Sequence, residues 1–231
     1  MMAQTFDAIV VGCGSVGVPS AYYLARKGLK VLALDKRPAV GQGDNKAAIG
    51  GVRATHSDPA KILICQESLR EFSTWEEAHG VDIDWKPGGY CFPVFSEEIE
   101  NTLKGILPLQ KSYGLNIDWV DADAVAELVP GIVREGLRGG TYSPGDGQVS
   151  SLKATVAFER AAMELGAEFR FNEPVVAYLR DGDSIAGVRT ARGEYLAPRV
   201  VLAAGADAGQ HGELLGIDIP VKPDSHEAGI T

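Results

Sequence analysis

Three glycines and an aspartate near the start of the chain have the spacing of a site that binds phosphate and sugar groups. Gly12, Gly14 and Gly17 follow an apolar run, and Asp35 stands 18 residues after the last of these glycines. In such a turn the first glycine lets the chain leave a strand sharply, the second lets the backbone approach a pyrophosphate, and the third lets helix and strand pack closely. An acid at about this distance accepts hydrogen bonds from ribose hydroxyls. The pattern predicts a dinucleotide site.

The elements that must position these residues form one strand–helix–strand unit over residues 7–35. An apolar strand at 8–11 leads into the glycines, a helix runs from them to Gly28, and a second strand at 31–34 ends at Asp35. The phosphates would lie at the helix N-terminus, where unpaired N–H groups and the positive end of the dipole favour an anion. Since the Asp35 carboxylate would repel a 2′-phosphate, NADP is disfavoured. The plainer alternative is a doubly wound sheet whose glycine turn binds nothing.

Length, charge and cysteine usage limit the classes of protein. With 231 residues, 45% of them hydrophobic, the chain can bury the core of one large or two small domains. A net charge of −9 without a basic patch argues against a nucleic-acid partner. We expect a cytoplasmic protein, because no apolar run could span a membrane and the first strand leaves no room for a targeting segment. Cys13, Cys65 and Cys91 lack CxxC spacing, so we expect small core residues and neither a metal site nor a disulfide.

The rest of the chain predicts an α/β domain interrupted by an antiparallel lobe. Asp58 and Pro59 predict the start of an amphipathic helix that runs to about residue 78. Residues 80–150 alternate strands and helices without a βαβ pattern, so we expect there an antiparallel lobe and a wall for a substrate. The other expected elements are strands at 85, 90–95 and 139–149, helices at 97–113, 122–128 and 152–165, a strand at 169–171, a β-meander over 174–196, and an apolar strand at 200–205.

The order of these motifs resembles one type of flavoprotein. The glycine turn, the crossover helix, the meander and a strand ending in Ala203-Ala204-Gly205 are similar to the glutathione-reductase type of FAD-binding Rossmann domain. Within that type the sequence resembles the D-amino-acid oxidase (DAO) family, and in it the sarcosine oxidase β-subunits and related amino-acid dehydrogenases. The matching segments are 11–17, 45–53, 203–206, 219–223 and 228–231, so the likeness covers essentially the whole chain.

The resemblance implies FAD as the cofactor and a role for each matching position. Asp35 would hold the adenosine ribose, Val176 would bond adenine through its backbone, and the loop 46–51 would lie along the isoalloxazine ring. Lys36 and Arg37 would flank the adenine. The positions implied to bind FAD are Gly12, Gly14, Ser15, Val16, Gly17, Asp35, Lys36, Arg37, Asn45, Lys46, Ala47, Ala48, Gly50, Gly51, Val176, Ala204 and Gly205.

For the substrate the resemblance implies that Arg53 faces a carboxylate, which suits a guanidinium because its planar fork donates two parallel charge-assisted bonds. A helix cap or a surface ion pair is the alternative for Arg53. His56 is a second catalytic candidate, with a hydrogen-bonding histidine as its alternative. His226 could face the flavin or solvent, and Tyr90 could line the lobe or fill its core. The family often has tryptophan where this chain has Asp207.

The resemblance also implies a division of the chain. Residues 1–80 would be the first part of the FAD-binding domain and 81–150 an inserted, incomplete substrate lobe. Residues 151–216 would complete the FAD-binding domain with the meander, and 217–231 would begin the return to the substrate lobe. Because members of the family are longer, the chain looks truncated at its C-terminus, and catalytic groups beyond Thr231 cannot be named.

The implied reaction is oxidation of the C–N bond of an amino acid or N-methyl amino acid (sarcosine, glycine, proline or a D-amino acid), with hydride transfer to flavin N5. Oxygen, a partner subunit or a quinone could take the electrons, and partner subunits or a homo-oligomer are possible. Three alternatives stay open: another FAD enzyme such as a monooxygenase, a non-catalytic FAD-binding subunit, and an NAD-only dehydrogenase.

Overall fold

The computed structural model describes residues 4–225 and divides the chain into two compact units. Unit 1 combines residues 1–49 with 151–231, and unit 2 is Gly50–Ser150. Unit 2 therefore begins at Gly50, whereas the sequence places the start of the inserted lobe at 81. The assignment of 81–150 to substrate binding stays a prediction, and the His226 candidate and the motif 228–231 lie outside the described residues.

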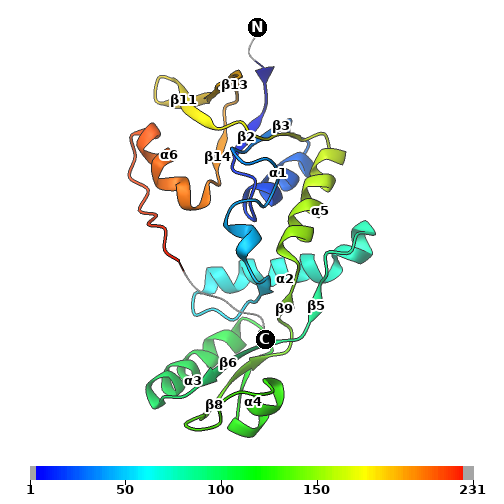
Figure 1. Ribbon diagram of the computed structural model, residues 1–231, viewed down its shortest axis with the longest axis vertical. Helices are drawn as coiled ribbons and strands as arrows, with labels where there is room; N and C mark the ends of the chain where they lie inside the picture. The colour runs from blue at the N-terminus through cyan, green and yellow to red at the C-terminus, as the bar shows by residue number, and fades with distance from the viewer. Residues whose placement is uncertain (1–3, 226–231) are drawn as a thin grey trace. The chain divides into compact units, whose positions relative to one another are not determined.

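Unit 1 contains the strand–helix–strand unit that the glycine spacing predicts. Strands β2 (Ala8–Val11) and β3 (Val31–Leu34) are parallel neighbours in a sheet of order β10-β3-β2-β14, and helix α1 (Gly17–Arg26) connects them (Figure 1). The outer strands, also parallel, are β10 (Glu168–Arg170) and β14 (Val200–Leu202). All residues of β2 and β3 are buried, as expected for parallel strands covered on both faces.

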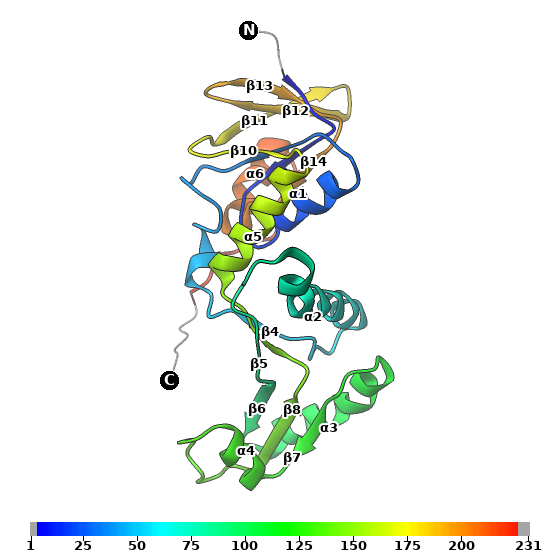
Figure 2. The ribbon, with the colours of Figure 1, turned by 90° about the vertical axis from the view of Figure 1, so that its right-hand side faces the viewer.

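A second sheet of unit 1 is the predicted meander. Its strands are β11 (Val175–Asp181), β12 (Ser184–Thr190) and β13 (Gly193–Leu196), and a short strand that the sequence does not predict, β1 (Gln4–Thr5), pairs in parallel with β13. Ile9, Val11, Leu32 and Leu34 of the parallel sheet share a core with Val188 and Tyr195 of the meander. Figure 2 shows the meander over one face of the parallel sheet, with α1 and α5 (Ser151–Glu164) on the other.

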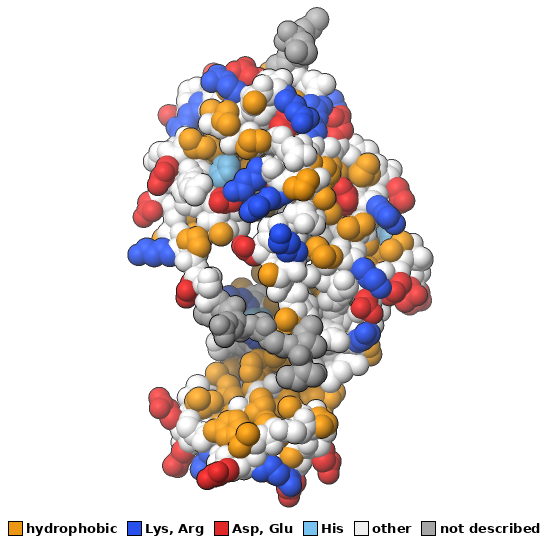
Figure 3. Space-filling model, viewed as in Figure 1, with side chains coloured by type: hydrophobic (Ala, Val, Ile, Leu, Met, Phe, Trp, Pro, Cys, Tyr) orange, Lys and Arg blue, Asp and Glu red, His pale blue; other side chains and the backbone are white. Residues whose placement is uncertain are grey.

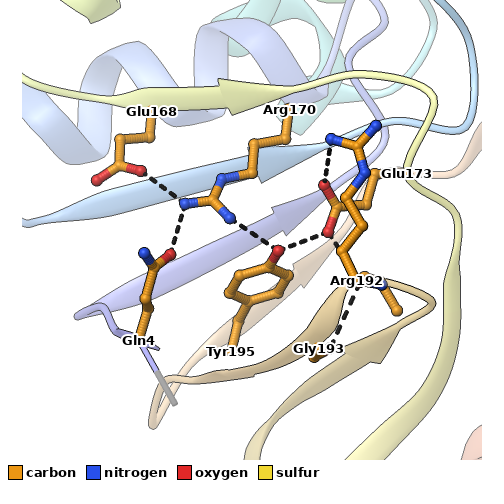
Figure 4. Close-up of polar contacts among 8 residues, drawn as sticks. Gln4, Glu168, Arg170, Glu173, Arg192, Gly193 and Tyr195 are labelled. Carbon is orange, nitrogen blue, oxygen red and sulfur yellow. Dashed lines mark hydrogen bonds and ion pairs between the residues drawn. The ribbon is translucent and has the colours of Figure 1, made fainter. Parts of the chain in front are cut away.

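A buried polar network crosses this core beside the meander. Glu173 is 1% exposed, and its Oε1 accepts hydrogen bonds from Tyr195 Oη at 2.6 Å and Thr190 Oγ1 at 2.8 Å. Arg170 Nη1 donates to the same tyrosine oxygen at 2.7 Å, and Arg192 Nη1 lies 3.4 Å from Glu173 Oε2 (Figure 4). The network joins the end of β10 to the hairpin β12–β13, because its members come from both.

Unit 2 is antiparallel, as the sequence predicts, and has two three-stranded sheets. One has the order β4-β9-β5 and the other β6-β8-β7. The bounds are β4 (Gly51–Val52), β5 (Lys86–Pro87), β6 (Tyr90–Val94), β7 (Asp118–Val120), β8 (Gly139–Ser143) and β9 (Gly147–Gln148), with helices α2 (Pro59–His79), α3 (Glu97–Ser112) and α4 (Ala122–Leu128). The short strands β4 and β7 carry too little pattern to be expected from sequence, and the predicted strand 139–149 is divided into β8 and β9.

Capping residues begin the helices of unit 2 where the sequence predicts. The Asp58 carboxylate accepts a hydrogen bond from Lys61 N at 2.9 Å, with Pro59 at the first helical position of α2. Ser96 and Asp121 cap α3 and α4 in the same way. One interpretation holds only in part: Cys13 is buried, whereas Cys65 and Cys91 are half-buried, and Cys65 packs against the hydrophobic core of unit 2.

Three further elements of unit 1 go beyond the predictions. The loop 41–51 contains a short 3-10 helix, η1 (Asp44–Ala47), and η2 (Gly205–Asp207) with α6 (Ala208–Leu215) follows β14. The predicted strand 200–205 therefore ends earlier, at Leu202, because the chain turns into η2.

Among residues 4–225 no helix is long and apolar enough to cross a membrane, and no three potential ligands gather as a metal site. On the face in Figure 3, acidic and basic side chains lie close to one another.

Candidate functional site

A cavity of about 590 Å³ opens in unit 1 at the carboxyl ends of β2, β3 and β14. This is the edge at which parallel α/β sheets bind ligands. We call it the glycine-loop cavity. Its lining comes from the loop after β2, the ends of β3 and β14, η1, the start of β11, and α6: Val11 to Val16, Leu34 to Arg37, Gly43 to Asn45, Glu173 to Val175, Leu202 to Ala208, Gln210, His211 and Leu214.

The three positions of the loop need glycine for different reasons. Gly12 has a φ of +100°, and a Cβ there would lie 2.3 Å from Ala203 O. A Cβ on Gly17 would lie 1.8 Å from Gly12 O, so the helix reaches the loop only because Gly17 lacks one. Gly14 lines the cavity, and a Cβ on it would meet nothing within 4 Å. Gly12 and Gly17 are thus required by packing, and Gly14 leaves open space where a ligand could approach the backbone.

The start of α1 forms one wall of this space. Its N-cap residue, Val16, makes no side-chain cap hydrogen bond, and no acid stands in the first turn. The first N–H groups of a helix need acceptors, and the helix dipole adds a partial positive charge there. The wall therefore suits the anionic oxygens of a diphosphate.

Asp35 is held rigidly at the end of β3. Its Oδ2 accepts a hydrogen bond from Cys13 N at 2.6 Å, and its Oδ1 accepts one from Arg37 N at 2.7 Å. Each carboxylate oxygen has a further lone pair, so both can still accept hydrogen bonds from ribose hydroxyls. The backbone contacts thus orient the acid toward the role that its spacing predicts.

Cys13 is among the residues that line the cavity, and its thiol is buried. Burial, and then the nearby carboxylates of Asp35 and Glu159, raise the pKa of this thiol far above the ordinary value. The thiol therefore stays protonated at neutral pH, and since the thiolate is the nucleophile, Cys13 is inert.

The opposite side of the cavity carries Asp207, singled out above only as a departure from the family's tryptophan, and residues that sequence reasoning missed. Asp207 of η2 forms an ion pair with Lys36, and His211 of α6 shares a hydrogen bond with Tyr178, the histidine Nδ1 lying 2.8 Å from the tyrosine Oη. Burial lowers the pKa of His211 and raises that of Tyr178 to about 12. Glu173 also reaches the lining. Only the Gly216 that ends α6 could have signalled this helix from sequence.

The structure brings ten of the predicted cofactor positions into the lining: Gly12, Gly14, Ser15, Val16, Asp35, Lys36, Arg37, Asn45, Ala204 and Gly205. Gly17 lies behind the loop, as its packing role requires. Val176 is 50% exposed and outside the lining, where its neighbour Val175 stands instead. Lys46, Ala47 and Ala48 also lie outside the lining, in and after η1, and Gly50 and Gly51 belong to unit 2.

Arg53 follows β4 in unit 2 and is oriented by its neighbours. Its Nη1 donates to Thr55 O at 2.5 Å, and its guanidinium carbon lies 5.6 Å and 5.2 Å from the ring centroids of Tyr90 and Phe92. Both distances are within the range of cation–π contacts, which are typical of arginine. Among the residues that the structure describes, these contacts of Arg53 are neither a helix cap nor an ion pair with a surface acid.

A buried acid supports the Arg53 segment. Asp146 is 1% exposed, and its Oδ1 accepts a hydrogen bond from Ala54 N at 3.1 Å. Burial raises the pKa of Asp146. Burial, and then the charge of Arg53, lower the pKa of His56, so this imidazole is neutral at pH 7. Gln110 Nε2 donates to the His56 carbonyl at 3.1 Å, which holds the backbone of this second candidate.

The fold and the cavity define an FAD-binding domain, and comparison with known proteins agrees. Residues 7–231 match the DAO family, described as FAD dependent oxidoreductase. The chain belongs to this family, whose cofactor is FAD, and the predicted family, fold class and cofactor are confirmed.

Similar proteins include amine and amino-acid oxidoreductases. The chain is 27% identical to 4-methylaminobutanoate oxidase (formaldehyde-forming) of Paenarthrobacter nicotinovorans, covering 94% of the chain and 26% of that protein. It is 25% identical to sarcosine oxidase subunit beta of Arthrobacter sp, covering 95% and 56%. The crystal structure of L-proline dehydrogenase from P. horikoshii superposes with a TM-score of 0.87 at 27% identity, covering 94% and 57%. The chain thus spans between about a quarter and somewhat over half of these relatives.

The residues present fit FAD. The open space at Gly14, the uncapped start of α1 and the oriented Asp35 carboxylate provide for a diphosphate and a ribose along one wall. The same acid would repel the extra phosphate of NADP.

Proposed function

We propose that this chain provides the FAD site and part of the substrate site of an oxidoreductase that oxidises the C–N bond of an amino acid or N-methyl amino acid. The observation that carries the proposal is the glycine-loop cavity with Asp35 fixed at its edge. When bound, FAD supplies the acceptor for the two electrons of the oxidation. Sarcosine, L-proline and 4-methylaminobutanoate, named in the relatives, each combine an amine with a carboxylate, which supports this substrate class.

We assign to Arg53 the binding of the substrate carboxylate. Its contacts with Thr55, Tyr90 and Phe92 fix the guanidinium plane, so that little side-chain entropy is lost when a carboxylate binds. His56, being neutral, could accept a hydrogen bond or a proton near the substrate amine. In this proposal Arg53 binds the substrate carboxylate, and His56 forms a hydrogen bond near the substrate amine.

The test uses the purified chain and its flavin spectrum. We expect FAD bound in a one-to-one ratio, and bleaching of its absorbance when sarcosine, L-proline or 4-methylaminobutanoate is added without oxygen. Arg53→Met should raise the substrate concentration needed for half-bleaching at least about tenfold, because a charge-assisted bidentate contact is lost. Arg70→Met, in an exposed pair with Glu67 on α2, is the matched control and should change nothing.

Each result separates parts of the proposal. Bound flavin that no amine bleaches would leave an FAD-binding protein and overturn the oxidase assignment. Bleaching by an aromatic hydroxylation substrate with a nicotinamide donor would favour the monooxygenase alternative. A colourless protein that binds NAD alone would overturn the cofactor assignment for this chain.

A further inference from the structure

An ion pair crosses the rim of the glycine-loop cavity. Lys36 directly follows the acid that ends β3, and Asp207 stands in η2 after β14. In the sheet β3 and β14 flank β2, whose end carries the glycine loop. Lys36 Nζ and Asp207 Oδ2 are 2.7 Å apart, and both residues line the cavity. The pair therefore joins two walls on either side of the loop.

The charges around the cavity make this pair more than a surface contact. Among the described residues four acidic residues line it, namely Asp35, Asp44, Glu173 and Asp207, of which Glu173 is only 1% exposed, against the cations Lys36 and Arg37. Asp35 and Glu173 each accept hydrogen bonds from donors of the chain, which disperse their charge. A diphosphate brings further negative charge into this lining, so each unbalanced carboxylate weakens its binding.

We propose that Lys36 sets the affinity of the cavity for FAD through Asp207, by cancelling the charge of that carboxylate at the rim. This inference rests on the proposed function in that it needs FAD to occupy the glycine-loop cavity. Lys36 acts here as a positioning and charge-balancing residue. Its loss then weakens binding only while residue 207 is a carboxylate.

The exposure of the pair limits the size of the effect. The two side chains are 47% and 33% exposed, so solvent screens much of their interaction. We expect Lys36→Met to raise the dissociation constant for FAD about fivefold at low salt, within the range of partly exposed charge pairs. Asp207→Asn should bind FAD within about twofold of the parent, and the double variant should recover to about the same level.

The experiment is a double-mutant cycle on the full chain stripped of flavin, titrated with FAD and followed by flavin fluorescence. The matched control is the pair Lys111–Asp118, also 2.7 Å apart but in unit 2, where Lys111→Met and Asp118→Asn should leave FAD affinity unchanged. The coupling should shrink at 1 M salt, where the Debye length falls to about 3 Å. Lys36→Arg keeps the charge and should bind FAD normally, which tests the inference even where Lys36→Met is poorly folded.

The outcomes are distinguishable. If the parent chain binds no FAD, the proposed function fails and this inference with it. If FAD binds but Lys36→Met weakens it by the same factor in the parent and in the Asp207→Asn background, Lys36 acts independently of the carboxylate and the inference is wrong. An effect of the same size at the control pair, or one insensitive to salt, would also overturn it.

Discussion

Replacing single glycines of the loop separates packing from ligand binding. In Gly17→Ala the new Cβ would lie 1.8 Å from Gly12 O, whereas ordinary contact begins near 3.4 Å, so helix or loop must move by about 1.6 Å. Such overpacking typically costs about 1–3 kcal/mol and sometimes more. In Gly14→Ala nothing lies within 4 Å of the new Cβ, so we expect the unfolding free energy to change by no more than about 0.5 kcal/mol.

The two variants should therefore differ in two assays. Urea unfolding without flavin should show Gly17→Ala destabilised and Gly14→Ala close to the parent. An FAD titration should show Gly14→Ala weakened at least about tenfold, because its methyl group occupies the space that a diphosphate would approach. A folded Gly14→Ala protein with parental FAD affinity would refute the placement of the diphosphate, and a fully stable Gly17→Ala protein would refute the packing argument.

Three further predictions concern buried acids and the ligand. Because burial raises the pKa of Asp146 in the folded state, the free energy of unfolding should fall as the pH rises from about 4 through that raised value, and Asp146→Asn should remove this decline. Asp146→Ala should lower the free energy of unfolding by about 1–3 kcal/mol in urea, because Ala54 N loses its acceptor. Tyr195→Phe should cost about 1–3 kcal/mol in the same assay, since Glu173 Oε1 loses a buried donor; an unchanged midpoint would contradict this. FAD at a concentration of about 100 times its dissociation constant should stabilise the chain by about 2.7 kcal/mol in thermal unfolding, whereas NADP at the same concentration should not stabilise it.

Short-range signals made the first half of the site predictable from sequence. The glycine spacing, the buried strands and the acid at Asp35 all lie within 7–35, where turn chemistry and hydrophobic runs act locally. The same holds for the capped start of α2 at Asp58. These features do not depend on what packs against them, and the structure has them where the spacing places them.

The residues on the opposite side of the cavity could not be predicted from local sequence signals. Asp207 and His211 reach the lining through η2 and α6, elements of three and eight residues with little periodicity. Val175 lies in the lining and Val176 does not, and the predicted contact of adenine with the Val176 backbone stays a prediction. Such assignments need tertiary placement, which spacing alone does not supply.

The meander and β14 have a consequence for the order of folding. The cavity joins residues 11–45 to residues 173–214, which are separated by the whole of unit 2. Contacts between segments so distant in sequence form late, because a long loop must close before they contribute. A nascent chain would thus acquire its cofactor site only after α6 has been synthesised, and uptake of FAD would report that the two separated halves of unit 1 have joined.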